Sequence, residues 1–204
     1  MAIEIELKAW VENPGQIKER LFKIARYEGE FLKEDAYWGR DGETPGMSPR
    51  QRRRLDLPLS GVRIRKLFRG LGAQKGDGQH SIVVTYKTKE VREGIEVNQE
   101  DEFEVSPGEP FEGLLKRMGL KPSFTKRKQG ASWNFEGITA ELTEVAGLGW
   151  FAELEILAED EKKETVENAR KRLLGLLEEI GIGEDKIESR YYTEMLKGIK
   201  NGGN

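Results

Sequence analysis

The chain has 204 residues, of which 36% are hydrophobic and 35% charged, and its formal net charge is −3. This length suits one domain with a substantial core, and the composition is that of a globular chain. Because 34 basic and 37 acidic side chains nearly cancel, we expect no general attraction to nucleic acid or to an acidic membrane. The absence of Cys and the single His80 exclude disulfides, thiolate sites and histidine metal clusters. Any bound metal should therefore be a hard ion with oxygen ligands.

The hydropathy of the chain predicts a soluble cytoplasmic protein. Residues 1–6 lack the basic segment and apolar stretch of a signal peptide. No apolar run approaches the ~20 residues that a membrane-spanning helix needs. We therefore expect no membrane partner.

The first predicted element is a strand over residues 2–10. Apolar and charged side chains alternate along it, which places Glu4, Glu6 and Lys8 on one face. A fully charged strand face is unusual, and it is the first candidate for a binding site.

The rest of the chain predicts further strands with helices between them. Asn13 and Pro14 begin a helix that should end by Gly29, and a strand follows at 30–38. Residues 40–60 collect Gly, Pro, Ser and Arg without apolar periodicity, which predicts a long mobile loop. Further strands are expected at 61–68, 80–88, 94–105, 121–129, 131–136, 138–145 and 150–157. Further helices are expected at 110–118, at about 160–180 and after Ser189. The class is α+β, with an antiparallel sheet of eight to nine strands that could close into a barrel.

Several of these strands place charges two residues apart, and therefore on one face of the sheet. The sets are Glu4/Glu6/Lys8, Arg63/Arg65, Lys87/Lys89, Lys126/Lys128 and Glu153/Glu155. For one isolated strand, a solvated outer face is the simpler interpretation. If the faces point into a barrel, unpaired charge there would be very costly, and a multiply charged ligand would resolve the conflict. Lys and Arg would then cover phosphate oxygens, while Glu would hold Mg²⁺ or Mn²⁺.

The ordered series of motifs resembles the CYTH, or triphosphate tunnel metalloenzyme, family. The motifs are Glu4-Ile-Glu6-Leu-Lys8, Arg63-Ile-Arg65, Tyr86-Lys87 and Gly147-Leu-Gly-Trp-Phe-Ala-Glu153. The resemblance spans nearly the whole chain as a single domain, residues 1–204. It implies a closed antiparallel barrel with flanking helices, whose tunnel holds triphosphate and divalent cations. The chain is most similar to the branch of class IV adenylyl cyclases, which also implies a homodimer.

The resemblance implies roles for individual residues as well. The implied metal ligands are Glu4, Glu6, Glu153 and Glu155. The implied phosphate-binding residues are Lys8, Arg63, Arg65, Lys87, Lys126, Lys128 and Arg190. Lys8, Arg65 and Glu153 would take part in catalysis. Asp35-Ala-Tyr37 resembles a motif of the second strand, and Ser189-Arg190-Tyr191 an element that closes over the site in relatives.

One position departs from the family pattern. Where relatives carry Asp four residues before the GLG motif, this chain has Thr143. Glu141 and Glu144 are the two candidates to replace that carboxylate. The departure leaves turnover open, and with it a role as a binding module.

We therefore predict a metal-dependent phosphohydrolase with Mg²⁺ or Mn²⁺ as cofactor. Its substrate would be a small triphosphate compound, either inorganic triphosphate, a nucleoside triphosphate or thiamine triphosphate. One alternative is a class IV adenylyl cyclase, which converts ATP to cyclic AMP and pyrophosphate. Another is a triphosphate-binding module without turnover.

Overall fold

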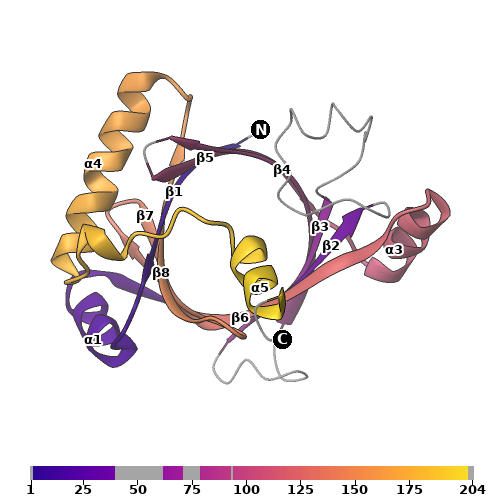
Figure 1. The fold of residues 1–204 in the computed structure, drawn as a ribbon, viewed down its shortest axis with the longest axis horizontal. Coiled ribbons are helices and arrows are strands. Elements are labelled where there is room, and N and C mark those ends of the chain that lie inside the picture. Colours follow the sequence, from indigo (N-terminus) through magenta and orange to yellow (C-terminus); the bar gives the residue numbers. More distant parts are fainter. Residues whose placement is uncertain (1, 40–61, 71–78, 93, 202–204) are drawn as a thin grey trace.

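The protein forms one closed barrel of eight strands, seen end-on in the computed structural model (Figure 1). The structure describes residues 2–39, 62–70, 79–92 and 94–201, so the predicted loop at 40–60 lies outside the described residues. Around the barrel the order is β1-β5-β4-β3-β2-β6-β7-β8, and every neighbouring pair is antiparallel. The predicted α+β class and closed antiparallel barrel are confirmed.

The elements have the following bounds. The strands are β1 (Ala2–Trp10), β2 (Arg26–Gly39), β3 (Val62–Arg69), β4 (Gln79–Arg92), β5 (Ile95–Glu104), β6 (Lys121–Phe135), β7 (Ile138–Val145) and β8 (Gly149–Ala158). The helices are α1 (Pro14–Ile24), α3 (Gly108–Arg117), α4 (Lys163–Glu179) and α5 (Tyr192–Asn201), with a short 3-10 helix at Glu184–Lys186. None of these described helices is long and apolar enough to cross a membrane.

Two predicted strands, 121–129 and 131–136, are a single strand in the structure. Gly130, which suggested a turn, pairs with Phe31 of β2 and Thr143 of β7 within β6. A Cβ at Gly130 would lie 2.1 Å from the carbonyl oxygen of Leu142. The glycine therefore allows two strands to approach closely, and the prediction of a break was wrong.

The first helix also ends earlier than predicted. Ala25 already has an extended backbone, and Arg26 and Tyr27 pair with β6. A register shift falls between Tyr27 and Gly29, where Gly29 has a φ of 121°. Gly29 thus marks an irregularity in a long strand rather than the end of a helix, because pairing with β6 satisfies the backbone there.

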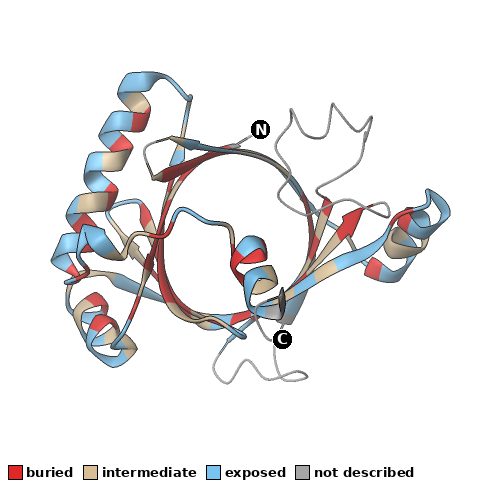
Figure 2. Ribbon diagram, in the orientation of Figure 1, coloured by how far each residue is buried: buried red, intermediate tan, exposed pale blue. Residues whose placement is uncertain are grey.

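The hydrophobic core lies between the barrel wall and the helices, outside the barrel. Ile5 and Leu7 of β1 face outward and are almost fully buried, together with Leu173 and Leu176 of α4. Figure 1 shows α1 and α4 on one side of the barrel and α3 on another. The buried residues of α4 recur along one side of the helix (Figure 2). Burial of each such side chain contributes roughly 1.5–3 kcal/mol, so the outer faces hold the fold together and leave the inner faces to polar residues.

The last helix, α5, lies across the mouth of the barrel (Figure 1). Tyr192 and Met195 of this helix form a small core with Val145 and Phe151. The Tyr192 and Phe151 rings meet edge to face with centroids 5.0 Å apart. This packing places the start of α5 at one end of the barrel interior.

Candidate active site

The barrel interior holds a cavity of about 510 Å³ that is lined mainly by charged side chains. The lining carboxylates are Glu4, Glu6, Glu96, Glu100, Glu102, Glu141, Glu153, Glu155 and Glu194. The lining cations are Lys8, Lys33, Arg63, Arg65, Arg69, Lys87, Lys126 and Lys128. All eight strands contribute, so residues from positions 4 to 194 meet in one space.

The strand order separates most of these charges into two walls. We define the acidic wall as the lining carboxylates of the contiguous strands β5, β1, β8 and β7. We define the basic wall as the lining cations of the contiguous strands β3, β2 and β6. Strand β4, which carries Lys87, lies between the two on one side. Lys8 is the basic residue that β1 adds to the acidic side.

Strand register explains how the acidic wall is assembled. Glu6 of β1 lies opposite Glu155 of β8 and opposite Glu96 of β5. Lys8 of β1 lies opposite Glu153 of β8. Because alternate residues share a face, one inward glutamate on β1 brings the inward glutamates of both neighbouring strands alongside it.

The basic wall is anchored by Asp35 of β2. Arg65 donates two hydrogen bonds to this carboxylate, at 2.7 Å to Oδ1 and 3.0 Å to Oδ2, and Lys126 approaches it to 3.3 Å. The Asp35 side chain is 0% exposed. Burial alone would raise its pKa, but Arg65 and Lys126 hold the pKa of Asp35 well below its ordinary value. Asp35 is therefore a fixed anion that orients the Arg65 guanidinium.

Lysine ion pairs join the basic wall to the acidic wall beside β7 and β8. Lys33 donates to both oxygens of Glu141 at 2.6 Å, and Lys128 donates to Glu153 at 2.8 and 2.6 Å. Burial lowers the pKa of Lys33 to about 8, although Glu141 opposes this shift. Burial raises the pKa of Glu153, but Lys128 and Lys33 outweigh it and hold the pKa below its ordinary value.

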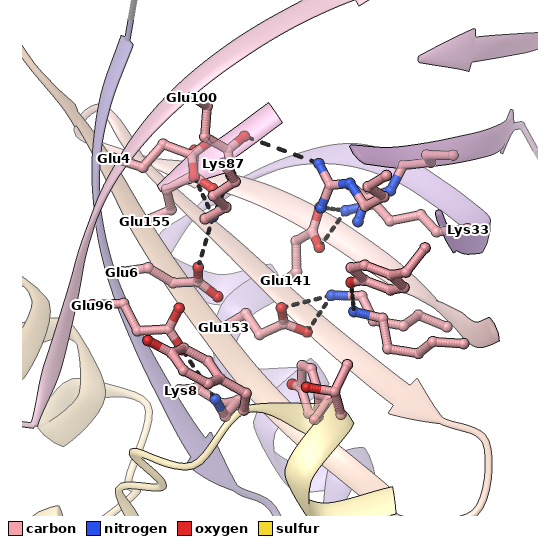
Figure 3. Close-up of a pocket in the computed structure, with 18 of the residues that line it drawn as sticks. Glu4, Glu6, Lys8, Lys33, Lys87, Glu96, Glu100, Glu141, Glu153 and Glu155 are labelled. Carbon is pink, nitrogen blue, oxygen red and sulfur yellow. Dashed lines mark hydrogen bonds and ion pairs between the residues drawn. The ribbon is translucent and has the colours of Figure 1, made fainter. Parts of the chain in front are cut away.

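A second cluster surrounds Lys87 on the acidic side (Figure 3). Its ammonium lies 2.7 Å from Glu4 Oε2 and 3.7 Å from Glu6 Oε2, and it also contacts Glu100 Oε1. Burial raises the pKa of Glu4 to about 7 against the opposing charge of Lys87. Burial, together with the charges of Glu4 and Glu6, raises the pKa of Glu155 to about 8. When fully ionised, this cluster would hold more negative charge than its cations offset, and for that reason two of its carboxyls retain protons up to near neutral pH.

The donor chemistry of this cluster fits a hard divalent cation. Carboxylate oxygens are the ligands that Mg²⁺ and Mn²⁺ prefer, and added positive charge would relieve the mutual repulsion of Glu4, Glu6 and Glu155. As the side chains stand, no group of three among the described residues is gathered closely enough to hold a metal ion. Binding would require these side chains to turn toward one another around the position of Lys87.

The structure brings together all the predicted site residues except Arg190. The residues that line the cavity as predicted are Glu4, Glu6, Lys8, Arg63, Arg65, Lys87, Lys126, Lys128, Glu153 and Glu155. Their individual roles in binding and catalysis remain predictions.

Arg190 lies outside the cavity, with a side chain that is 63% exposed. Its Nε donates a hydrogen bond to Glu188 at 2.9 Å. The same carboxylate accepts a second hydrogen bond, of 3.1 Å, from the indole nitrogen of Trp10. Arg190 thus helps to fix the segment that leads into α5. The placement does not support phosphate binding by this residue, and the next residue, Tyr191, lines the cavity instead.

The position of Thr143 is also settled by the structure. Thr143 is fully buried, its hydroxyl has no hydrogen-bond partner, and it is not among the cavity-lining residues. Of the two candidates to replace a carboxylate there, Glu141 lines the cavity. Glu144 lies on the outer side and accepts a hydrogen bond from Gln129 at 2.7 Å.

Several lining residues were not predicted from the sequence. They include Lys33, Arg69, Glu100 and Glu102. A signal was available for Lys33 and Arg69, since Lys33 lies two residues from Asp35 and Arg69 lies four residues from Arg65 on the same strand. Extending the alternation along these two strands would have found both residues, whereas no inward residue had been predicted on the strand that carries Glu100 and Glu102.

Tyr192 closes the cavity at the end where α5 begins. Its ring lies 4.8 Å from the Lys8 ammonium, 5.1 Å from that of Lys126 and 5.4 Å from that of Lys128. Three ammonium groups therefore gather around one aromatic ring, an arrangement that cation–π attraction stabilises.

Comparisons with known proteins agree with this architecture. The family model of the CYTH domain matches residues 2–192. A Methanocaldococcus jannaschii protein named provisionally as an adenylate cyclase is 26% identical over 196 residues, covering 95% of this chain and 98% of its own. The structure of the PH1819 protein from Pyrococcus horikoshii has a TM-score of 0.74 at 25% identity, covering 96% of this chain and 99% of its own. A Hippeastrum protein assigned to the adenylyl cyclases, and described as having a dominant triphosphatase activity, has a TM-score of 0.62 at 19% identity. It covers 97% of this chain and 96% of its own, and this likeness is one of fold alone.

Proposed function

Because the chain belongs to the CYTH domain family, we propose that it is a metal-dependent phosphohydrolase acting on a small triphosphate compound held in the tunnel. The observation that carries this proposal is the facing of the acidic wall and the basic wall across one cavity of about 510 Å³. A ligand of either charge alone would satisfy one wall and repel the other. A triphosphate with a divalent cation presents negative oxygens to one wall and positive charge to the other.

The basic wall supplies the phosphate contacts in this proposal. Arg63 and Arg65 present guanidinium groups whose donors match pairs of phosphate oxygens, and Lys126 and Lys128 add ammonium groups. Arg65 is already oriented by Asp35, so little reorganisation is needed when the phosphates arrive. Donors fixed in this way stabilise charge that develops on the leaving phosphate, and each is worth about 3 kcal/mol in comparable sites.

The acidic wall supplies the cation site. Glu4, Glu6, Glu153 and Glu155 would hold Mg²⁺ or Mn²⁺, which when bound neutralises phosphate charge and polarises the phosphoryl group that water attacks. Glu153 would exchange its Lys128 partner for this role, and the released ammonium would be available to the phosphates. The ion pair between the two walls would thus be replaced by a contact of Glu153 with the cation and a contact of Lys128 with the phosphates.

The direct test is a turnover assay with purified protein. Incubation with Mg²⁺ or Mn²⁺ and inorganic triphosphate, ATP or thiamine triphosphate should release orthophosphate from at least one of them. Arg63→Ala should lower this activity, whereas Lys66→Ala, an exposed residue on the same strand, should not. Absence of phosphate release from all three compounds would contradict the proposal.

A second candidate is the adenylyl cyclase reaction. It is favoured by the Methanocaldococcus jannaschii relative, whose similarity extends over 95% of this chain. In that reaction the ribose 3′-hydroxyl of ATP attacks the α-phosphate, and pyrophosphate leaves. Chromatography of the products separates the candidates, because cyclisation yields cyclic AMP and pyrophosphate while hydrolysis yields orthophosphate.

A third candidate is a triphosphate-binding module without turnover. Thr143, buried and outside the cavity lining, is the observation that favours it. Calorimetry that showed tight binding of triphosphate while every turnover assay stayed flat would select this candidate over both enzymes.

A further inference from the structure

Lys87 differs from the other lysines that bridge the tunnel in the number of carboxylates it contacts. Lys33 and Lys128 each donate to one glutamate. The Lys87 ammonium lies among three, at 2.7 Å from Glu4, 3.7 Å from Glu6 and in direct contact with Glu100. One ammonium therefore serves a cluster, as a bound cation would.

The position of Lys87 in the fold allows it to reach either wall. Strand β4 lies between β5 of the acidic wall and β3 of the basic wall. Figure 3 shows the Lys87 side chain directed into the group of Glu4, Glu6 and Glu100. Arg63 of the basic wall approaches the same Glu100 carboxylate to 3.9 Å, so the border between the walls lies beside this cluster.

We propose that the Lys87 ammonium is an internal counter-ion that holds the place of a divalent cation among Glu4, Glu6 and Glu100, and that it turns to the phosphates when that cation binds. A divalent cation and an ammonium cannot share the same carboxylates at close range, because their repulsion in a partly buried site is strong. The flexible four-carbon stem of lysine allows its charge to move without a change in the strand.

This exchange couples the two ligands of the tunnel. A cation that arrives alone must displace an ammonium whose new position lacks an anion. A triphosphate supplies that anion, so the cation and the triphosphate should each bind more tightly in the presence of the other. Lys87 thereby disfavours occupation of the acidic wall by metal alone.

The inference rests on the proposed function in one respect, that the acidic wall takes a divalent cation. It is tested by binding alone, without turnover. Electron paramagnetic resonance of free Mn²⁺ gives the affinity of the full chain for Mn²⁺ in buffer without phosphate. The samples are wild type, Lys87→Met and Lys87→Gln, where Gln can still donate hydrogen bonds to the carboxylates and so supports folding. Thermal melting of each variant shows that it is folded.

Lys126→Met is the matched control for the general effect of removing a positive charge from the tunnel. Lys126 lines the same cavity, but it pairs with Asp35, which keeps its two hydrogen bonds from Arg65. Its removal therefore frees no carboxylate for the metal.

We expect both Lys87 variants to bind Mn²⁺ about tenfold more tightly than wild type, and Lys126→Met to change the affinity by less than about threefold. Unchanged or weaker binding by the Lys87 variants would overturn the inference, whatever the phosphate-release assay shows. An equal gain in Mn²⁺ affinity in Lys126→Met would overturn it too, because the gain would then come from removing any positive charge from the tunnel. Failure of Mn²⁺ to bind any of the proteins, with or without inorganic triphosphate, would overturn the inference and also remove the metal from the proposed function.

Discussion

The basic and acidic walls of the tunnel face each other but differ in how their charges are balanced. In the basic wall, Arg65 and Lys126 share the buried Asp35, whose pKa lies well below its ordinary value because of them. In the acidic wall, burial and neighbouring carboxylates raise the pKa of Glu4 to about 7 and that of Glu155 to about 8. The basic wall is therefore preorganised, whereas the acidic wall, when ionised, would carry surplus negative charge that a divalent cation would offset.

The largest effect should come from breaking the anchor of the basic wall. Arg65→Leu leaves the fully buried Asp35 carboxylate with Lys126 at 3.3 Å and with the weaker influence of the Arg63 charge. Loss of one partner of a buried ion pair costs about 3–5 kcal/mol, which should lower the melting temperature by on the order of 10 °C. Circular dichroism during thermal unfolding measures this.

Two controls define the origin of that loss. The double variant Arg65→Leu with Asp35→Leu removes both charges and should recover most of the stability. Lys66→Leu changes an exposed residue on the same strand and should shift the free energy of unfolding by less than about 0.5 kcal/mol. If Arg65→Leu were as stable as Lys66→Leu, Asp35 would not be the anchor described here.

An intermediate effect is expected on β7, which supplies matched inward and outward glutamates. Glu141→Gln removes a carboxylate of the acidic wall and weakens the contact that holds Lys33 at 2.6 Å. It should lower kcat/KM for the preferred triphosphate about tenfold. Glu144→Gln, whose carboxylate faces Gln129 outside the tunnel, should leave kcat/KM unchanged. Equal kinetics for the two variants would remove Glu141 from the site.

The smallest effect concerns the surplus charge of the acidic wall and its dependence on pH. The folded pKa of Glu155 is about 8 and its ordinary value is 4.5, so between these values the folded state binds more protons than the unfolded state. Stability contributed by this group therefore falls as the pH rises through that window. The amide side chain in Glu155→Gln does not ionise. The free energy of unfolding of this variant should therefore rise relative to that of wild type between pH 5 and pH 8, by on the order of 1–2 kcal/mol.

Urea unfolding at pH 5, 7 and 9 measures this gain. Glu144→Gln, which is not in the cluster, should show a difference from wild type that does not vary with pH. Added Mg²⁺ should reduce the advantage of Glu155→Gln at pH 9, because the cation stabilises the ionised wild-type wall. If the difference in unfolding free energy between Glu155→Gln and wild type did not vary with pH, ionisation of Glu155 would not destabilise the acidic wall.

Much of the tunnel could be predicted from the sequence because strand alternation has a period of two. The alternation showed that Glu4, Glu6 and Lys8 share a face, and this face lines the cavity. The alternation alone could not show whether the charged face or the apolar face lies inside. That depends on α1, α3 and α4 covering the apolar faces, which is a property of the whole fold.

The break predicted at Gly130 was wrong, and Arg190 does not line the cavity, because of contacts that the local sequence does not show. Gly130 has the local character of a turn, but it serves the close approach of β6 and β7 at Leu142. Arg190 lies beside a lining residue, yet Glu188 holds its guanidinium away from the cavity. Neither contact leaves a periodic signal in the sequence.

The two walls of the tunnel together should bind one triphosphate with a divalent cation. Isothermal titration calorimetry with a non-hydrolysable imidotriphosphate tests it on wild type, Arg63→Ala and Glu6→Gln, each with Mg²⁺ and with a chelator. We predict one site per chain, tighter binding with Mg²⁺ than with chelator, and about tenfold or greater weakening by either substitution in the presence of Mg²⁺. Absence of binding to wild type, or binding that neither substitution weakens, would contradict the account.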